Sequence, residues 1–272
     1  MPRPPECGVG QWLILCFVPD VNGGQEGNQH RRWVTRSGID VVTVVVGLNL
    51  LVFAYMVTLP TETALLSFIQ AGAISVDGLR SGAWWQTVTH LFIHGGNLGT
   101  AMRLIHLTVN LLLIYQVGKE LLSDVGTWHW LGIYGLSGVL GGLLQIAVTP
   151  DSPLLGASAA AFGLMTAYCA IHAYEVLEVW ILGFPTRLGG AAFGRGLIVS
   201  SALLGLVSLV SAAAIPFLSN IGHWAHLGGA LGGVAYVRLL GMHPRTLTRD
   251  DILEERAAND ARLKAKRVFP SV

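Results

Sequence analysis

The chain has 272 residues, of which 52% are hydrophobic and only 12% are charged, and its formal net charge is +1. A soluble domain carries roughly 25% charged residues, so this composition indicates a membrane protein. The near-neutral charge gives no reason to expect a nucleic-acid partner. Three scattered cysteines favour neither a disulfide framework nor a cysteine metal site.

Residues 1–39 are the first predicted region, a loosely ordered cytoplasmic tail rich in Gly, Pro, Asn and Gln. Its apolar run from Trp12 to Val18 has seven residues and no small-residue cleavage site after it. A signal peptide is therefore the less favoured interpretation. The opposite end, residues 241–272, is predicted to be a charged cytoplasmic tail.

Long stretches without charge predict the membrane spans, because about 20 apolar residues cross a bilayer. We expect an all-α membrane protein with six transmembrane helices between residues 40 and 240. The predicted spans are Val41 to Pro60, the stretches between Arg103 and Lys119, between Asp124 and Asp151 and between Asp151 and Glu175, and two helices within 196–237, separated at 216–220.

Lys and Arg residues predict the orientation, since they concentrate in cytoplasmic segments. With both termini in the cytoplasm, 15 of the 17 basic residues fall on the inner side, and Arg80 and Arg103 fall outside. The long segment 61–103 then lies outside. Its adjacent Trp84 and Trp85 are typical of a segment in the membrane interface, and the predicted location is the cell membrane.

Polar residues gather near the starts of three predicted spans that run in the same direction. The second span carries His106 and Asn110, four residues apart and therefore on one helical face. The fourth span opens with Ser158, and the sixth opens with His223 and His226. Polar groups in a membrane are costly and usually face the interior of a bundle, so we expect a single polar site.

These residue types suit acyl transfer by a serine–histidine dyad. A serine hydroxyl is a weak nucleophile until a base removes its proton, and His226 can be that base, with His223 as the less favoured alternative. Attack on a carbonyl creates an oxyanion, which needs hydrogen-bond donors. His106, Asn110 and the Ser158 backbone N–H are the candidates. No Asp or Glu lies within these spans, so a triad is not expected.

Each motif also has a structural interpretation. A lone serine among small residues usually serves helix packing, and the glycines after His226, Gly229 among them, allow close helix approach. A metal centre built from His90, His94 and His106 is disfavoured, because no carboxylate or cysteine accompanies them. We expect neither a metal nor a cofactor.

Taken together, the motifs resemble those of rhomboid intramembrane serine proteases. The matching pieces are WWQTVTHLFIH before the second span, HLTVN from His106 to Asn110, GASAAAFG from Gly156 to Gly163, and AHLGGALGG around His226. The resemblance covers roughly residues 41–240.

The resemblance implies roles for individual residues. Ser158 is the expected nucleophile and His226 the expected base. His106 and Asn110 are the expected oxyanion stabilisers. His90 and His94 match structural histidines of the family's first loop, and Phe162 falls where the family often has an aromatic ring packed against the catalytic histidine.

Two departures from the family pattern are visible. Ala159 stands directly after the serine, where the family usually has glycine, and this methyl group removes no catalytic group. The stretch from Gly95 to Arg103 is longer than usual between the first loop and the second span.

The resemblance implies an endopeptidase that cleaves the transmembrane segments of other membrane proteins near the outer face of the bilayer. The alternative is a catalytically inactive relative that binds membrane clients, for which Ala159 is the only sequence hint. A transporter or channel ranks last, because it would place charged or paired polar groups along a full crossing or break its helices at the midplane.

Overall fold

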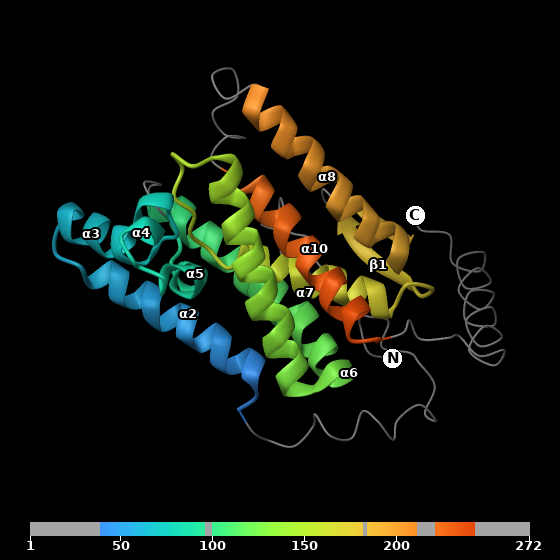
Figure 1. Ribbon diagram of the computed structural model, residues 1–272. Helices are drawn as coiled ribbons and strands as arrows, with labels where there is room; N and C mark the ends of the chain where they lie inside the picture. The colour runs from blue at the N-terminus through green and yellow to red at the C-terminus, as the bar shows by residue number, and fades with distance from the viewer. Residues whose placement is uncertain (1–38, 96–99, 182–183, 211–220, 243–272) are drawn as a thin grey trace, which may run out of the picture.

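The computed structural model describes residues 39–95, 100–181, 184–210 and 221–242. These residues are mostly helical (Figure 1). In chain order the elements are α2 (Val41–Thr58), α3 (Glu62–Gly72), α4 (Val76–Arg80), α5 (Gln86–Thr89), the 3-10 helix η1 (His90–Phe92), α6 (Thr100–Val148), α7 (Ser158–Ile171), β1 (Val176–Ile181), β2 (Phe184–Gly189), α8 (Gly190–Val210) and α10 (His223–Leu239).

Helix α2 begins where the sequence predicts the first span. Asp40 caps it, because its carboxylate accepts a hydrogen bond of 3.0 Å from the Thr43 N–H. The same carboxylate forms an ion pair with Lys119 of α6. The cap and the ion pair together fix the start of α2 against α6.

Helix α6 is two helices joined at Gly126, which has φ 76° and ψ 171°. A straight helix of this length would be about 74 Å long, more than twice the apolar thickness of a bilayer. Positive φ is readily available only to glycine, so Gly126 lets the chain turn back. The sequence predicts two spans here, and the structure places the break between them at this residue. Figure 1 shows α6 turning back on itself.

The second half of α6 packs with α7 and α10 at the centre of the molecule. Small residues let their backbones touch: a Cβ built at Gly229 would lie 2.0 Å from the carbonyl oxygen of Ala159, and one at Gly233 would lie 2.0 Å from that of Gly163. One hydrogen bond crosses the same interface, from Thr166 Oγ1 of α7 to the Ala230 carbonyl of α10 (2.8 Å). This is the close packing of small residues that membrane helices use.

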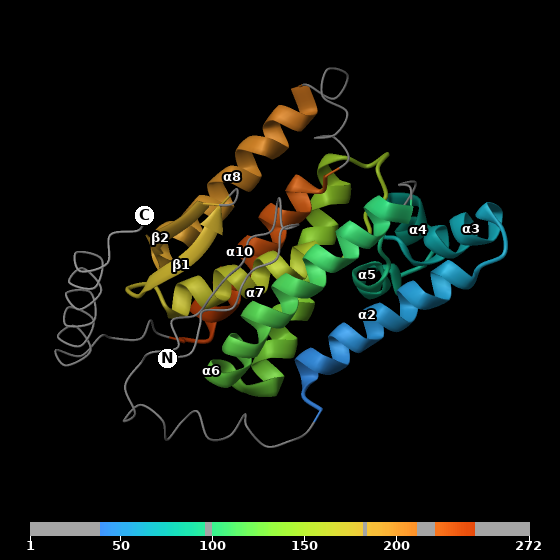
Figure 2. The same cartoon turned by 180° about the vertical axis from the view of Figure 1, so that it is seen from behind.

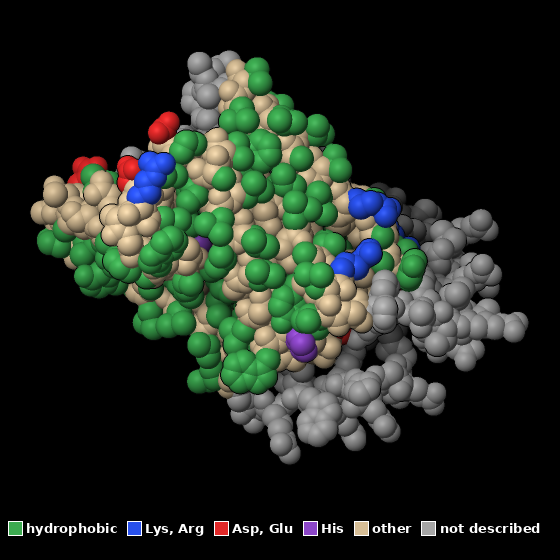
Figure 3. All heavy atoms as spheres, viewed as in Figure 1, with side chains coloured by type: hydrophobic (Ala, Val, Ile, Leu, Met, Phe, Trp, Pro, Cys, Tyr) green, Lys and Arg blue, Asp and Glu red, His purple; other side chains and the backbone are tan. Residues whose placement is uncertain are grey.

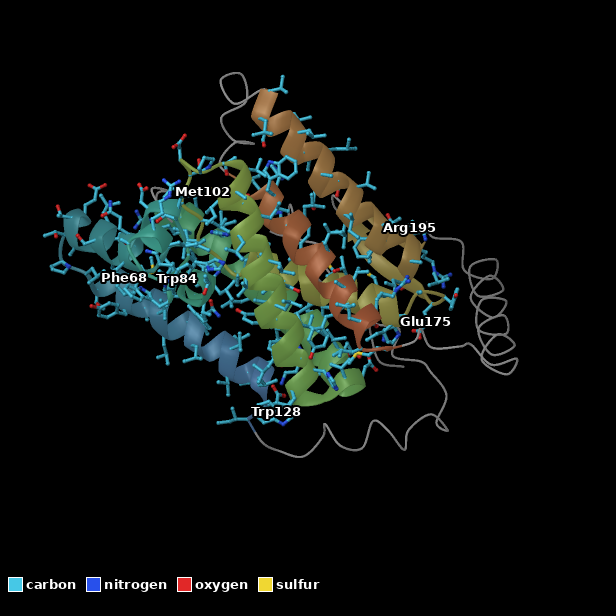
Figure 4. The ribbon with its side chains drawn as sticks, viewed as in Figure 1. Phe68, Trp84, Met102, Trp128, Glu175 and Arg195 are labelled. Atoms are coloured by element: carbon cyan, nitrogen blue, oxygen red, sulfur yellow. The ribbon has the colours of Figure 1, made fainter. Side chains whose placement is uncertain are left out.

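The segment between α2 and α6 folds into short helices rather than an open loop. Trp85 Nε1 donates to the Ala71 carbonyl (2.9 Å), and Gln86 Nε2 donates to the Gln70 carbonyl (3.0 Å). These bonds hold α3 against α5. Trp84 stays largely exposed, as its predicted place in a membrane interface requires, and lies with Phe68 on this outlying part of the molecule (Figure 4).

A β-hairpin of strands β1 and β2 follows α7, in a region where the sequence predicts only a cytoplasmic connection. The strands pair antiparallel, with Glu178 opposite Arg187. The hairpin returns the chain to the end of α7, where the Gly190 N–H donates to the Glu175 carbonyl (2.9 Å) and α8 begins. Figure 2 shows the hairpin beside α7 and α8.

The end of α7 is tied to the break in α6 through His172. Its Nε2 lies 2.8 Å from Asp124 Oδ2, and its Nδ1 lies 2.8 Å from Glu175 Oε1. Burial works against a charge on this ring, but the two carboxylates outweigh it and raise the pKa of His172 above its usual value.

Within the described residues, three helices are long and apolar enough to cross a membrane: Val41–Thr58, Ala101–Val148 (which includes both halves of α6) and Gly190–Val210. Exposed leucine, valine and aromatic side chains cover these helices. On the face in Figure 3 hydrophobic side chains dominate the middle of the molecule, while charged ones gather toward two opposite ends. The chain is therefore an integral membrane protein. Almost all residues of the two predicted tails lie outside the described part of the chain.

Candidate active site

Ser158 is the first residue of α7, and a constrained turn places it there. Ile74 and Leu154 exchange two backbone hydrogen bonds of 2.9 Å, which fix the chain just before the turn. Gly156 then takes φ +112°, a conformation that side chains other than glycine rarely adopt. The helix begins two residues later, so the Ser158 side chain lies half-buried at its N-terminal end.

The same turn packs directly on His106 and Asn110 of α6. A Cβ built at Gly156 would lie 2.9 Å from His106 Cε1 and 4.0 Å from Asn110 Nδ2. Asn110 Nδ2 donates to the His106 carbonyl (3.0 Å). An amide has two N–H bonds, so a second donor is left for another acceptor. His106 and Asn110 therefore lie beside the start of α7, as the sequence predicts.

Two fully buried histidines also hold this turn, through hydrogen bonds to its backbone. The His90 carbonyl accepts a hydrogen bond from the Gly156 N–H (2.8 Å), and His94 Nε2 accepts one from the Ala157 N–H (3.3 Å). The His94 ring also makes an edge contact with His106, with centroids 5.2 Å apart. Both histidines thus act on the backbone next to Ser158.

These two rings are electrically neutral at physiological pH. Burial lowers the pKa of His90 to about 4. Burial, together with the neighbouring His106, lowers the pKa of His94 to about 3. A neutral His94 with its acceptor nitrogen toward Ala157 carries its proton on Nδ1, since a neutral imidazole has one donor and one acceptor.

His226 reaches the site from α10 by stacking on Phe162 of α7. The two rings are almost parallel, with centroids 4.2 Å apart and an angle of 6° between their planes. Phe162 lies four residues after Ser158 and so on the same face of the helix. The His226 ring therefore lies on the face of α7 that carries Ser158, within about one helical turn.

Close contact between the helix backbones makes this placement possible. At Gly229 a Cβ would clash with the backbone of Ala159, so only glycine fits there. The Ala159 side chain points toward α6, where a Cβ at Gly141 would lie 2.5 Å from it. The absence of a side chain at Gly141 makes room for the methyl group that distinguishes this chain from the usual family pattern.

In the described part of the chain, no hydrogen bond joins the Ser158 hydroxyl to the His226 ring. Catalytic hydrogen bonds are often long before substrate binds. His223 lies edge-on to His226, with centroids 6.1 Å apart, and is buried. The ring that stacks on Phe162 is that of His226, the histidine that the sequence favours as the base.

One residue of this region was not predicted from the sequence. Gln145 of α6 accepts a hydrogen bond of 3.0 Å from the Ala225 N–H, next to His226. Its only sequence signal is an amide inside a charge-free stretch. Across residues 39–95, 100–181, 184–210 and 221–242, no group of three His, Cys, Asp or Glu residues is arranged to hold a metal ion.

Comparison with known proteins gives a family match and distant relatives. The model of the rhomboid domain matches residues 81–243, more than half of the chain. Rhomboid-like protease 3 of Toxoplasma gondii is 30% identical over 65% of this chain and 59% of its own length. The chloroplastic Rhomboid-like protein 11 of Arabidopsis thaliana is 32% identical over 62% of this chain and 57% of its own.

A third relative is the rhomboid protease GluP of Bacillus subtilis (strain 168), which is 25% identical over 72% of this chain and 34% of its own length. The chain thus spans between about a third and three fifths of these relatives. The family match covers Ser158, His226, His106 and Asn110. The chain belongs to the rhomboid family.

Proposed function

We propose that this chain is an intramembrane serine endopeptidase, with Ser158 as nucleophile and His226 as general base. The observation that carries the proposal is the stack of His226 on Phe162, one helical turn from Ser158. The proximity of His106 to the Gly156 turn supports it, because donors then lie beside the nucleophile. Two relatives named as proteases point the same way.

The proposed reaction begins with attack of Ser158 Oγ on a peptide carbonyl carbon, while its proton moves to His226. The carbonyl oxygen becomes an oxyanion, and the free N–H of Asn110, the His106 ring and the Ser158 backbone N–H are its proposed donors. The C–N bond then breaks, and His226 returns the proton to the leaving amine. Water then attacks the acyl carbon while His226 takes its proton, the bond from that carbon to Ser158 Oγ breaks, and His226 returns the proton to Oγ.

We propose that the site lies below the outer surface of a six-span bundle with cytoplasmic ends. Helix α7 has 14 residues, which gives about 21 Å of length against about 30 Å of apolar thickness. If its far end reaches the inner surface, its Ser158 end lies within the outer part of the bilayer. Water would enter from the outside, consistent with the basic residues predicted on the opposite side.

The proposed substrates are transmembrane segments of other proteins. A helical carbonyl is already hydrogen-bonded and shielded, so a substrate helix must unwind locally before attack. Glycine or proline near the cleaved bond lowers the cost of unwinding, because both are poor helix formers. The cell membrane is the proposed location, whereas two relatives are named as chloroplastic and one as mitochondrial.

Cleavage of a model membrane substrate in liposomes tests this proposal. Wild type is expected to cleave, whereas Ser158→Ala and His226→Ala are expected to be inactive although folded. Ser152→Ala is the matched control, because Ser152 is an exposed serine in the turn before α7. Binding without cleavage by the wild type would instead favour the inactive, client-binding alternative.

A further inference from the structure

Among the described residues, the segment just before α10 supplies no side-chain cap to the start of this helix. The first N–H groups of a helix have no partner within the helix, and a side chain just before it usually supplies one. The N-cap residue here is Gly222, which has no side chain to offer. The His223 N–H bonds to the Ile221 carbonyl (2.8 Å), but the Ala225 N–H needs an acceptor from elsewhere.

Gln145 supplies that acceptor from α6, 80 positions earlier in the chain. Its Oε1 accepts the Ala225 N–H at 3.0 Å in a buried contact. Gly222 lies beside both side chains: a Cβ built there would be in ordinary contact with Gln145 Oε1 (3.5 Å) and would press on Leu154 Cδ1 (2.9 Å).

The Gln145 side chain is itself held in one orientation. It is 7% exposed, and its Nε2 donates to Thr149 Oγ1 (2.8 Å). Thr149 Oγ1 in turn donates to the Gln145 backbone carbonyl (2.9 Å). Because the nitrogen is engaged by Thr149, the amide oxygen faces Ala225. The acceptor is therefore set in place by α6 and by Thr149, the residue directly after it.

This contact lies one residue before His226. The His226 N–H makes the first-turn bond to the Gly222 carbonyl (2.9 Å), so the ring position follows from where α10 begins. We infer that Gln145 is a positioning residue for His226: its amide oxygen caps α10 from α6 and fixes the height and rotation of the proposed base over Phe162. This inference rests on the proposed function of His226.

Substitution of Gln145 tests the inference in the full-length chain reconstituted in liposomes. Gln145→Leu removes the oxygen and leaves the Ala225 N–H buried without a partner. We expect kcat to fall about tenfold or more with KM unchanged, since small misplacements of a catalytic group cost this much. Gln145→Glu keeps an acceptor oxygen in either protonation state, and we expect it to restore most of kcat.

Thr166→Val is the matched control. It removes another hydrogen bond to the α10 backbone, at Ala230, one turn beyond His226. We expect its kcat to stay close to that of wild type. If Gln145→Leu does not fold, Gln145→Asn replaces it, because Asn keeps the amide but is one methylene too short to reach Ala225.

The outcomes separate this inference from the proposed function. An inactive wild type contradicts the protease assignment itself. An active wild type whose Gln145→Leu or Gln145→Asn variant keeps full kcat overturns the positioning role alone. Equal losses in Thr166→Val and Gln145→Leu, or no rescue by Gln145→Glu, would also overturn it, because the effect would then be general loosening of α10.

Discussion

The His226 ring lies flat on the Phe162 ring, with centroids 4.2 Å apart and planes 6° from parallel. This contact joins α10 to α7 one turn below Ser158. It limits the ring to a narrow range of tilts, so an apolar neighbour sets the plane of the proposed base. An aromatic side chain thus orients the proposed base in a site where a carboxylate is not expected.

Replacement of Phe162 by Leu should lower kcat. Aromatic pairs contribute about 0.5–1.5 kcal/mol beyond their buried area, so we expect a loss of roughly 2- to 10-fold with little change in KM. Phe162→Tyr keeps the ring and should remain close to wild type. Initial rates at saturating substrate measure both variants, and full kcat in Phe162→Leu would contradict the orienting role.

Replacement of Gly156 by Ala should damage the site more severely. The new Cβ would lie 2.9 Å from His106 at a positive φ, and we expect about 1–3 kcal/mol of strain and a large loss of activity. Gly135→Ala is the control, because nothing lies within 4 Å of that position. Thermal unfolding and cleavage assays on both variants test this, and equal behaviour of the two would refute the packing account.

Replacement of Asn110 by Leu should slow the chemical step. Loss of one oxyanion donor typically costs about 100- to 1000-fold in kcat, and KM should change little because the interaction strengthens only in the transition state. Asn49→Leu is a comparison outside the site, since Asn49 is also a buried asparagine whose Nδ2 bonds to its own helix, at the Val45 carbonyl. A normal kcat in Asn110→Leu would remove Asn110 from the proposed oxyanion site.

Acid should destabilise the fold through His90 and His94. Their pKa values of about 4 and about 3 lie below the ordinary histidine value of 6.5. Below about pH 6.5 the unfolded state binds more protons than the folded state. The stabilising contribution of the two histidines is therefore fully present above about pH 6.5 and is lost as the pH falls. Each histidine contributes a slope of about 1.4 kcal/mol per pH unit.

His94→Gln isolates this effect. Glutamine keeps an acceptor for the Ala157 N–H but does not titrate, so the midpoint of thermal unfolding should fall less between pH 6.5 and pH 4.5 than in wild type. An unaltered acid dependence in His94→Gln would show that another group controls it.

The sequence is informative wherever a single helix or a short motif carries the signal. The charge-free run from Val41 predicts α2, and the four-residue spacing of His106 and Asn110 predicts their common face. The order of the motifs predicts a family that the domain match confirms. The predicted six-span count and cytoplasmic termini remain predictions.

Contacts between distant segments could not be predicted in the same way. The charges between Lys119 and Asp124 suggested the end of a span, but helix continues through them and breaks at Gly126, because charged residues at a membrane surface are still good helix formers. The Gln145–Ala225 bond joins residues 80 positions apart, and the β-hairpin pairs two neighbouring strands after α7. Neither has a periodic signature in the sequence.

Labelling with a fluorophosphonate probe tests the central claim most directly. The probe loses fluoride as the activated serine oxygen bonds to phosphorus, so it reports the nucleophile without requiring a known substrate. Wild type and Ser152→Ala should become labelled, with mass spectrometry placing the adduct on Ser158, whereas Ser158→Ala and His226→Ala should not react. A wild-type chain that stays unlabelled, or a Ser158→Ala variant that still reacts, would contradict a catalytic Ser158.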